Sequence, residues 1–173
     1  VFKLGVINIY DAQDLLENKN QNAHFNLMND IFVELDQSKG ERLIETLNGT
    51  FEGNGHTITI KIIGETITPI HDAYLNLIHN VTANGVLRNL KVIYDYTMTA
   101  DVNYASLLVD NNDGVIENIE MDVSFSLYYV NRGFGYVSRT GTGTVRNLLL
   151  KITTGNNSWQ FSSLDDGYGK FIV

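Results

Sequence analysis

The stretch GVLRNLKV at residues 85–92 recurs as GVIENIEM at residues 114–121 and as GTVRNLLL at residues 143–150. Each copy begins with glycine, has an apolar residue at its third position and asparagine at its fifth, and is apolar again at its sixth and eighth positions. The asparagines are Asn89, Asn118 and Asn147, so the copies follow a constant 29-residue period. A repeat of constant length in this range is typical of proteins in which one structural unit stacks on the next.

The repeated unit predicts the fold class. A unit made of short alternating strands and turns cannot bury its apolar face alone, whereas stacked units share one continuous core. Residues one period apart then lie above one another, about 4.8 Å apart. We expect the third, sixth and eighth positions to face this core, and the asparagine to mark a bend. The prediction is an all-β, single-domain right-handed parallel β-helix, or β-solenoid.

The charges test this register. Stacking at the repeat period places Arg88, Glu117 and Arg146 in one outward column of alternating sign, and Lys91 opposite Glu120 in a neighbouring column. Exposed pairs of this kind are worth only about 0.2–1 kcal/mol each, so they specify register more than they stabilise the fold.

The asparagines form the candidate structural ladder. We expect Asn89, Asn118 and Asn147 to lie in an inner ladder, with their amides bonded to each other and to the backbone of the bend. The loops that precede each repeated glycine are uneven, spanning residues 80–84, 110–113 and 138–142. Loops of this kind on one side of a solenoid are where binding surfaces usually develop.

The whole chain, residues 1–173, is assigned to one domain. Residues 1–22 are expected to cap the solenoid, residues 23–155 to form the coils, and residues 156–173 to be either a C-terminal lid or a strand that pairs with another chain. Both interpretations of the C-terminal segment remain open.

The expected cap consists of a strand over residues 2–9 and a short helix over residues 11–16. Asp11 is the expected N-cap of this helix. Ala12, Leu15 and Leu16 are expected on one face of it.

Composition limits the possible partners. Lysine and arginine number 12 against 20 acidic residues, and the net charge of −8 disfavours nucleic acid and anionic lipid surfaces. The apolar runs are far shorter than the roughly 20 residues that cross a bilayer, so we expect no membrane insertion. Cysteine is absent, which does not by itself indicate a compartment. The first residue is Val1, which would suit either a mature product whose leader was removed or part of a longer protein, and we favour an extracellular, cell-surface or virion-surface location.

Two segments before the repeats carry a resemblance to a known group. Residues 24–31, HFNLMNDI, and residues 49–58, GTFEGNGHTI, resemble the opening coils of right-handed parallel β-helix proteins. The repeated units are similar to the later coils of that group, the GLUG-type repeats of bacterial surface proteins. Together the matches cover about residues 22–152. The resemblance implies the β-helix fold, and the group includes adhesins, carbohydrate-associated modules and phage proteins.

Parallel β-helices also include polysaccharide lyases and hydrolases, so an enzyme is the alternative interpretation. A hydrolase needs carboxylates that converge on one bond, commonly about 5–9.5 Å apart. The candidate pairs are Asp110 with Asp113, and Asp165 with Asp166. Because Asp110 is expected to stack near Val81 and Arg139 rather than on another acid, we assign no catalytic residue.

Metal and cofactor motifs are weak. Residues 110–114, DNNDG, resemble half of a calcium loop, but the later glutamate that completes such a loop is not at the needed offset. The histidines share no metal-ligand spacing, and we expect His56 to bond backbone in its turn. The chain carries no Walker-type phosphate loop. We therefore assign no metal and no cofactor.

Three asparagines fit the N-x-[ST] glycosylation pattern, namely Asn48, Asn80 and Asn156. They matter only in a protein secreted by a glycosylating cell. The sequence as a whole predicts a non-enzymatic structural or binding module of a cell surface, extracellular filament or virion. Its expected partner is a glycan or a protein, or copies of itself.

Overall fold

The computed structural model describes residues 3–36, 43–64, 72–74, 76–97, 102–126, 130–135 and 137–154. These residues form one short helix and fifteen strands. In chain order the elements are β1 (Gly5–Ile9), α1 (Ala12–Asn18), β2 (Ala23–Leu27), β3 (Ile31–Asp36), β4 (Ile44–Leu47), β5 (Thr50–Glu52), β6 (Thr57–Ile63), β7 (Asp72–Tyr74), β8 (Ile78–Val81), β9 (Val86–Thr97), β10 (Val102–Ser106), β11 (Val109–Asn112), β12 (Val115–Ser126), β13 (Val130–Gly135), β14 (Ser138–Thr140) and β15 (Thr144–Thr154).

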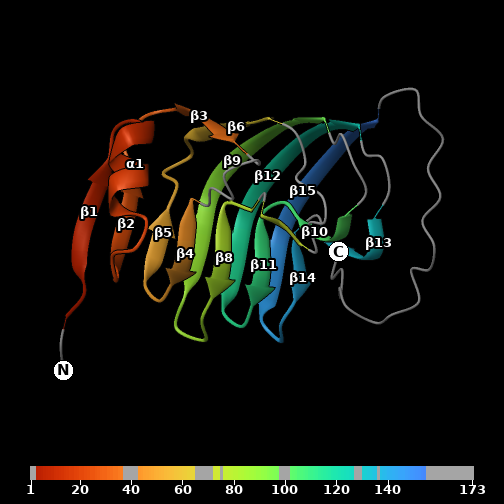
Figure 1. The fold of residues 1–173 in the computed structure, drawn as a ribbon. Helices are drawn as coiled ribbons and strands as arrows, with labels where there is room; N and C mark the ends of the chain where they lie inside the picture. Colours follow the sequence, from red (N-terminus) through yellow and green to blue (C-terminus); the bar gives the residue numbers. More distant parts are fainter. Residues whose placement is uncertain are drawn as a thin grey trace.

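The strands form three parallel sheets (Figure 1). The long sheet has the order β1-β2-β5-β9-β12-β15, and it also contains β3 and β6, which pair with each other and, through β6, with β9. The four-stranded sheet has the order β14-β11-β8-β4, and the three-stranded sheet the order β13-β10-β7. From β7 to β15 the chain visits the three-stranded, four-stranded and long sheets in this order, three times over. The fold is therefore all-β, with each passage adding one parallel strand to each sheet.

The long sheet has the register that the repeat predicts. Val115 of β12 pairs with Val86 of β9 on one side and with Thr144 of β15 on the other, each one repeat period away. The same spacing holds along the pairing from Val115 to Phe125. Equivalent residues of the three copies consequently share one side of the sheet.

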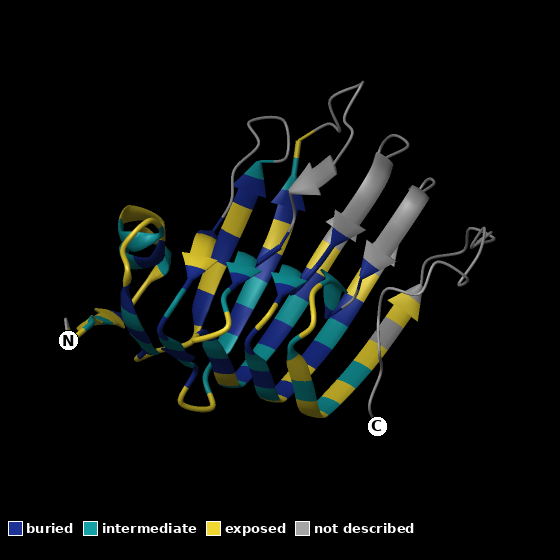
Figure 2. Cartoon of the chain, turned by 90° about the horizontal axis from the view of Figure 1, so that it is seen from below, coloured by how far each residue is buried: buried dark blue, intermediate teal, exposed yellow. Residues whose placement is uncertain are grey.

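The core positions of the repeat are confirmed. Leu87 and Ile116, at the third position, are fully buried, and so are Val92 and Met121 at the eighth. Their counterparts in β15 are partly buried against the same core. Figure 2 shows the buried bands running across neighbouring strands. One apolar column from each strand position therefore continues through the stack.

The glycine that opens each copy is required by close backbone approach. A Cβ atom on Gly114 would clash with the carbonyl oxygen of Gly85, and one on Gly143 would clash with that of Gly114. The same carbonyls accept hydrogen bonds from the next strands, at 3.0 Å from the Val115 amide nitrogen and 2.8 Å from that of Thr144. Only glycine lets the turns stack this tightly.

The N-terminal cap matches the predicted elements with one correction. Helix α1 begins after Asp11, whose side chain accepts a hydrogen bond from the Asp14 amide at 2.9 Å. Leu15 is fully buried, but Leu16 is 37% exposed, so the expectation that it shares the buried face is wrong. Adjacent helical residues lie about 100° apart around the axis, so a helix of seven residues resting on a sheet end buries a narrower face.

The C-terminal segment, residues 156–173, lies outside the described residues, and so does its assignment as a lid or a pairing strand. Within the described part of the chain, no helix is long and apolar enough to cross a membrane.

The register of the long sheet predicts where an engineered disulfide forms. Ser124 and Thr153 are exposed and directly paired on β12 and β15. Their Cα atoms should lie about 4.8 Å apart, within the range that a disulfide bridges. Because the chain has no cysteine of its own, the double variant Ser124→Cys/Thr153→Cys should oxidise to a single intramolecular disulfide, seen by mass spectrometry after trypsin digestion. The control Ser124→Cys/Leu149→Cys is four residues out of register, and efficient closure of that pair instead would contradict this register.

Candidate functional site

The asparagine ladder lies at the bend of the long sheet. Asn89, Asn118 and Asn147 adopt the left-handed conformation, with φ of 56°, 55° and 52°. Non-glycine residues rarely adopt this region, and asparagine tolerates it best because its short amide can bond locally. Asn54, which follows β5 in the strand order of the long sheet, has φ of 53° and continues the series. The repeated asparagine therefore has a conformational reason as well as a hydrogen-bonding one.

The amides bond in one direction along the stack. Asn147 Nδ2 donates to Asn118 Oδ1 at 2.9 Å, and Asn118 Nδ2 donates to Asn89 Oδ1 at 2.9 Å. Asn89 Nδ2 in turn donates to Glu52 Oε1 at 2.8 Å. The carboxylate of Glu52, which the repeat pattern did not identify, accepts the last hydrogen bond of this series.

The expected inner position of this ladder is wrong, because Asn118 and Asn147 are exposed. A left-handed residue inserts an extra step into the alternation of the strand. The buried residues of β12 on either side of the bend are Ile116 and Ile119, three positions apart, and both Glu117 and Asn118 between them point outward. The bend thus needs the asparagine conformation, and the same conformation turns its amide toward solvent.

Charged columns run beside the ladder. Arg146 Nε lies 2.6 Å from Glu117 Oε2, and Arg88 Nε lies 2.7 Å from Glu52 Oε2. Lys91 Nζ lies 2.8 Å from Glu120 Oε1, as the register predicts. Signs therefore alternate from strand to strand on the outward face.

The ionisation of Glu52 follows from these contacts. Burial raises its pKa, but the hydrogen bonds from Asn89, Arg88 and the Asn54 amide outweigh burial, so the pKa lies below its ordinary value. Glu52 is thus an ionised acceptor where the ladder meets the charge column.

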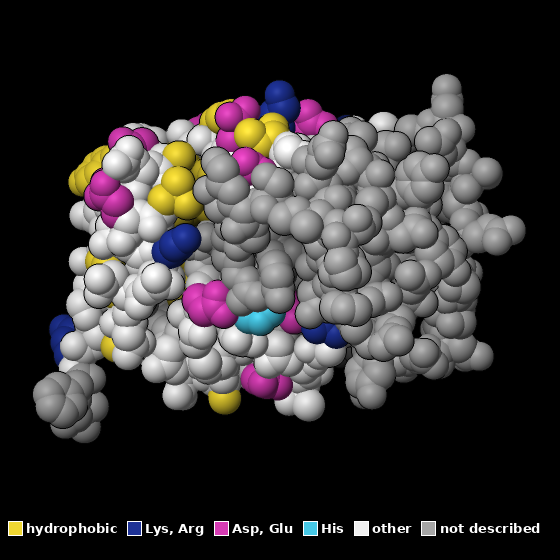
Figure 3. All heavy atoms as spheres, viewed as in Figure 1, with side chains coloured by type: hydrophobic (Ala, Val, Ile, Leu, Met, Phe, Trp, Pro, Cys, Tyr) yellow, Lys and Arg dark blue, Asp and Glu magenta, His cyan; other side chains and the backbone are white. Residues whose placement is uncertain are grey.

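A second polar row crosses the four-stranded sheet. Glu45, His79, Asp110 and Arg139 occupy equivalent positions on β4, β8, β11 and β14. Figure 3 shows this face, with acidic and basic side chains beside a histidine. Arg139 binds Asp110 through two parallel contacts, Nε to Oδ1 at 2.8 Å and Nη2 to Oδ2 at 2.9 Å. His79 Nδ1 lies 3.9 Å from Asp110 Oδ2.

Asp110 lies beside Arg139, as the repeat period predicts, but its predicted position beside Val81 is wrong. Val109 pairs with Ile78 and not with Asn80, the residue one repeat period earlier, so His79 stands opposite Asp110. Val81 pairs with Asn112 instead. Two extra residues between the strands of this sheet shift the register relative to the long sheet. The unequal loops carried this signal, but their lengths alone do not say which sheet absorbs the difference.

Asp110 is also bonded from the core side. Ser106 Oγ donates to Asp110 Oδ1 at 3.0 Å, and Asn76 Nδ2 donates to Ser106 Oγ at 2.9 Å. Burial raises the pKa of Asp110, but the hydrogen bond and charge of Arg139, with Ser106 and His79, outweigh burial and lower it. Such a carboxylate stays ionised, which suits a structural ion pair better than proton donation to a leaving group.

The acidic candidates of the loop have separate partners. Asp113 accepts from Asn111 Nδ2 at 2.9 Å and from the Thr142 amide at 3.1 Å, and these bonds lower its pKa. It therefore ties its own turn to the next one. Among the described residues, no group of three or more histidine or acidic side chains is placed to hold a metal ion. Asp165 and Asp166 lie outside the described residues.

The histidines take unrelated positions. His24 Nδ1 accepts from the Thr50 amide at 3.0 Å, and His56 Nδ1 lies 3.2 Å from Asp30 Oδ1. The ring of His56 therefore contacts a carboxylate, and the expected bond from this side chain to backbone is wrong. His71 lies outside the described residues.

Two glycosylation candidates are described. Asn48 follows β4, and its Oδ1 accepts from Thr82 Oγ1 at 2.8 Å. Asn80 lies within β8 and is half-buried. Asn156 lies outside the described residues. Glycosylation usually requires a surface loop, so Asn48 is the better placed of the two.

Two substitutions at Asn118 separate conformation from hydrogen bonding. Asn118→Ala loses the amide bonds and places alanine at φ of 55°, and it should lower the free energy of unfolding by about 2–3 kcal/mol. Asn118→Gly loses the bonds but tolerates the angle, and it should cost only about 1 kcal/mol. Urea denaturation measures both, and equal losses would contradict a conformational role.

The Asp110–Arg139 pair predicts a pH-dependent contribution to stability. The folded-state pKa of Asp110 lies below its ordinary value near 3.8, so its stabilisation is full above that value and is lost as the pH falls through the folded-state pKa. Asp110→Asn should therefore cost about 2 kcal/mol at pH 7, and the difference from wild type should shrink below about pH 4. Denaturation at a series of pH values measures this, with Glu34→Gln on β3 as the control, and a difference that persists at low pH would contradict the assignment.

Comparisons with models of known protein families, with curated proteins and with solved structures found no match. The resemblance to GLUG-type repeats therefore stays a prediction from the sequence.

Proposed function

We propose that this chain is a right-handed parallel β-helix that serves as a non-enzymatic structural or binding module of a cell surface, extracellular filament or virion. Its partner would be a glycan, a protein or another copy of itself. The observation that carries the proposal is the cyclic passage of the chain through three parallel sheets, with successive strands of the long sheet in one register. A coil that returns to the same three sheets is how a β-helix is built, and parallel crossovers are right-handed in about 98% of cases.

The use of the charged groups supports a scaffold. Arg88, Lys91 and Arg146 are each paired to a carboxylate on an adjacent strand. Asp110 is held by Arg139, and Asp113 by its own turn and the next one. These charged side chains are used in contacts between neighbouring strands. They are therefore suited to keeping the surface rigid for binding, and not to cleaving a bond in a substrate.

The alternative is a small polysaccharide-active enzyme. The observation in its favour is the row on the four-stranded sheet, where Glu45 and Asp110 stand on either side of His79. Two strand spacings separate these acids, about 9–10 Å along the sheet, near the upper limit for an inverting hydrolase. The lowered pKa of Asp110 counts against it, because the general acid of such an enzyme has a raised pKa.

A panel of polysaccharides distinguishes the two candidates. The chain is incubated with neutral and acidic polysaccharides, and new reducing ends and unsaturated products are measured. We expect neither product with the wild type, with Asp110→Asn or with the matched variant Asp113→Asn. Immobilised glycans and extracellular proteins are then screened for retention, which should be the same for all three chains. Turnover that Asp110→Asn abolishes and Asp113→Asn preserves would refute the proposal in favour of the enzyme.

A further inference from the structure

The start of the long sheet has an edge that no described strand covers. Strand β3 pairs with β6 on one side, and within the described part of the chain no strand pairs with its other side. After β1 the chain turns into α1 instead of continuing along β3 (Figure 1). Helix α1 contacts β3 at this end but forms no strand pairing with it, so the backbone of this edge can still accept a further parallel strand.

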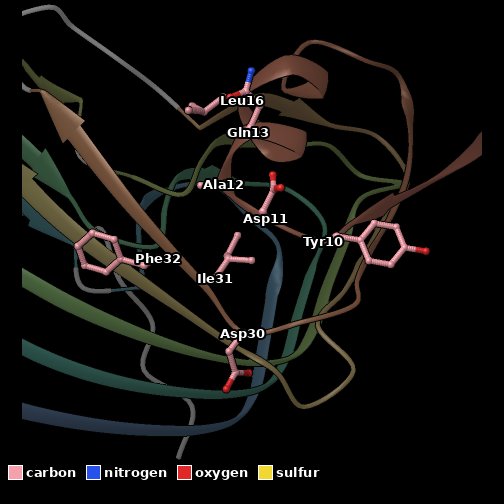
Figure 4. A pocket seen from close by; sticks show the side chains of 8 residues that line it. All are labelled: Tyr10, Asp11, Ala12, Gln13, Leu16, Asp30, Ile31 and Phe32. Atoms are coloured by element: carbon pink, nitrogen blue, oxygen red, sulfur yellow. The ribbon is translucent and has the colours of Figure 1, made fainter.

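A hollow of about 460 Å³ lies between α1 and the start of β3 (Figure 4). Tyr10, Leu16 and Phe32 are among the residues that line it, and they are 52%, 37% and 56% exposed. Large apolar side chains this exposed are few in the described residues, and three of them border this hollow, with the rings of Tyr10 and Phe32 directed away from each other (Figure 4). A volume in this range suits the side chains of a bound ligand.

The hollow is also acidic. Asp11 and Asp30 line it, and none of the described residues around it is lysine or arginine. Glu34 lies farther along β3 on the exposed face, where Lys61 of β6 stands opposite it on the paired side. On its paired side, strand β3 thus already faces a basic residue. A basic residue would suit its unpaired side as well.

We propose that the open edge of β3 binds an extended segment of a partner polypeptide in which apolar and basic residues alternate. The backbone of the segment pairs with β3 as an added strand. Its basic side chains lie on the outward face beside Asp30, Phe32 and Glu34, and its apolar side chains lie on the opposite face, toward Ile31 and Leu16 beside α1. The inference rests on the proposed binding role and names a surface and a partner chemistry for it.

The alternation follows from the strand itself. Ile31, Val33 and Leu35 point into the core, while Phe32 and Glu34 point outward. A strand added in register presents alternate side chains to these two environments. Cations are favoured beside the ring of Phe32 and beside the carboxylates. The hydrogen bond from the Thr57 amide to Asp30, the first of several influences, lowers the pKa of Asp30, so this carboxylate is ionised at neutral pH.

The test uses a fluorescein-labelled hexapeptide of alternating valine and lysine, with fluorescence anisotropy at low salt as the readout. The wild-type chain should bind it, and the valine–glutamate hexapeptide should not bind. Asp30→Asn/Glu34→Gln should weaken binding by about tenfold. The matched variant Asp95→Asn/Glu120→Gln removes two carboxylates from β9 and β12 of the same sheet and should leave binding within about twofold.

Backbone pairing is tested with two N-methylated versions of the same hexapeptide. One carries N-methyl groups on the amide nitrogens of the odd-numbered residues, and the other on those of the even-numbered residues. A strand added to a parallel edge pairs through the amides of alternate residues. At least one of the two methylated peptides should therefore fail to bind. The proposal would be overturned if both methylated peptides still bound. It would also be overturned if Asp30→Asn/Glu34→Gln and Asp95→Asn/Glu120→Gln lost affinity for the hexapeptide equally. Circular dichroism of each variant confirms that the fold persists.

Two further results would also refute the proposed binding site at β3. Absence of hexapeptide binding together with self-association that Asp30→Asn/Glu34→Gln weakens, measured by sedimentation velocity, would assign the edge to a second copy and overturn the proposal. The chain could also fail to bind the hexapeptide and yet be retained by a glycan or a protein, equally in wild type and in Asp30→Asn/Glu34→Gln. That result would refute the β3 site alone. The proposed function would stand in that case.

Discussion

The rest of the structure depends on the left-handed asparagine at the bend of each unit. Its φ near 55° allows residues three positions apart, such as Ile116 and Ile119, to face the same core. Its amide then bonds to the equivalent residue in the next coil. If the register slipped by one residue, these bonds would break and apolar residues would exchange sides with charged ones. Conformation, hydrogen bonding and burial therefore all favour the same stacking.

The charged columns add specificity to this constraint with little stability. Arg88, Glu117 and Arg146 are exposed or half-exposed, and pairs of this kind contribute little free energy in water. A shifted stack would place like charges together, in a chain that already carries a net charge of −8. The columns thus act mainly against wrong registers, while the apolar columns inside supply most of the stability.

The repeat was sufficient to predict the pairing of β9, β12 and β15 in the long sheet, because equal spacing fixes which residues are neighbours. It predicted the buried Leu87 and Met121 and the contact of Lys91 with Glu120. It placed the asparagines inside, since the pattern records the interruption of alternation but not the direction in which the amide turns. It also missed His79 beside Asp110, because a constant period cannot show that the four-stranded sheet takes a longer step between β8 and β11.

The regular and irregular parts of the stack differ in how much surface they leave for other molecules. Where the repeat is regular, from β9 to β15, several polar side chains of one strand form hydrogen bonds or ion pairs with side chains of the next strand. At the start of the long sheet the repeat stops, α1 replaces a strand, and Tyr10, Phe32 and Asp30 are left around a hollow. A stacked fold meets other molecules most readily where its own next coil is missing. The edge of β3 is such a place, and its acidic, apolar lining gives that contact a chemical preference.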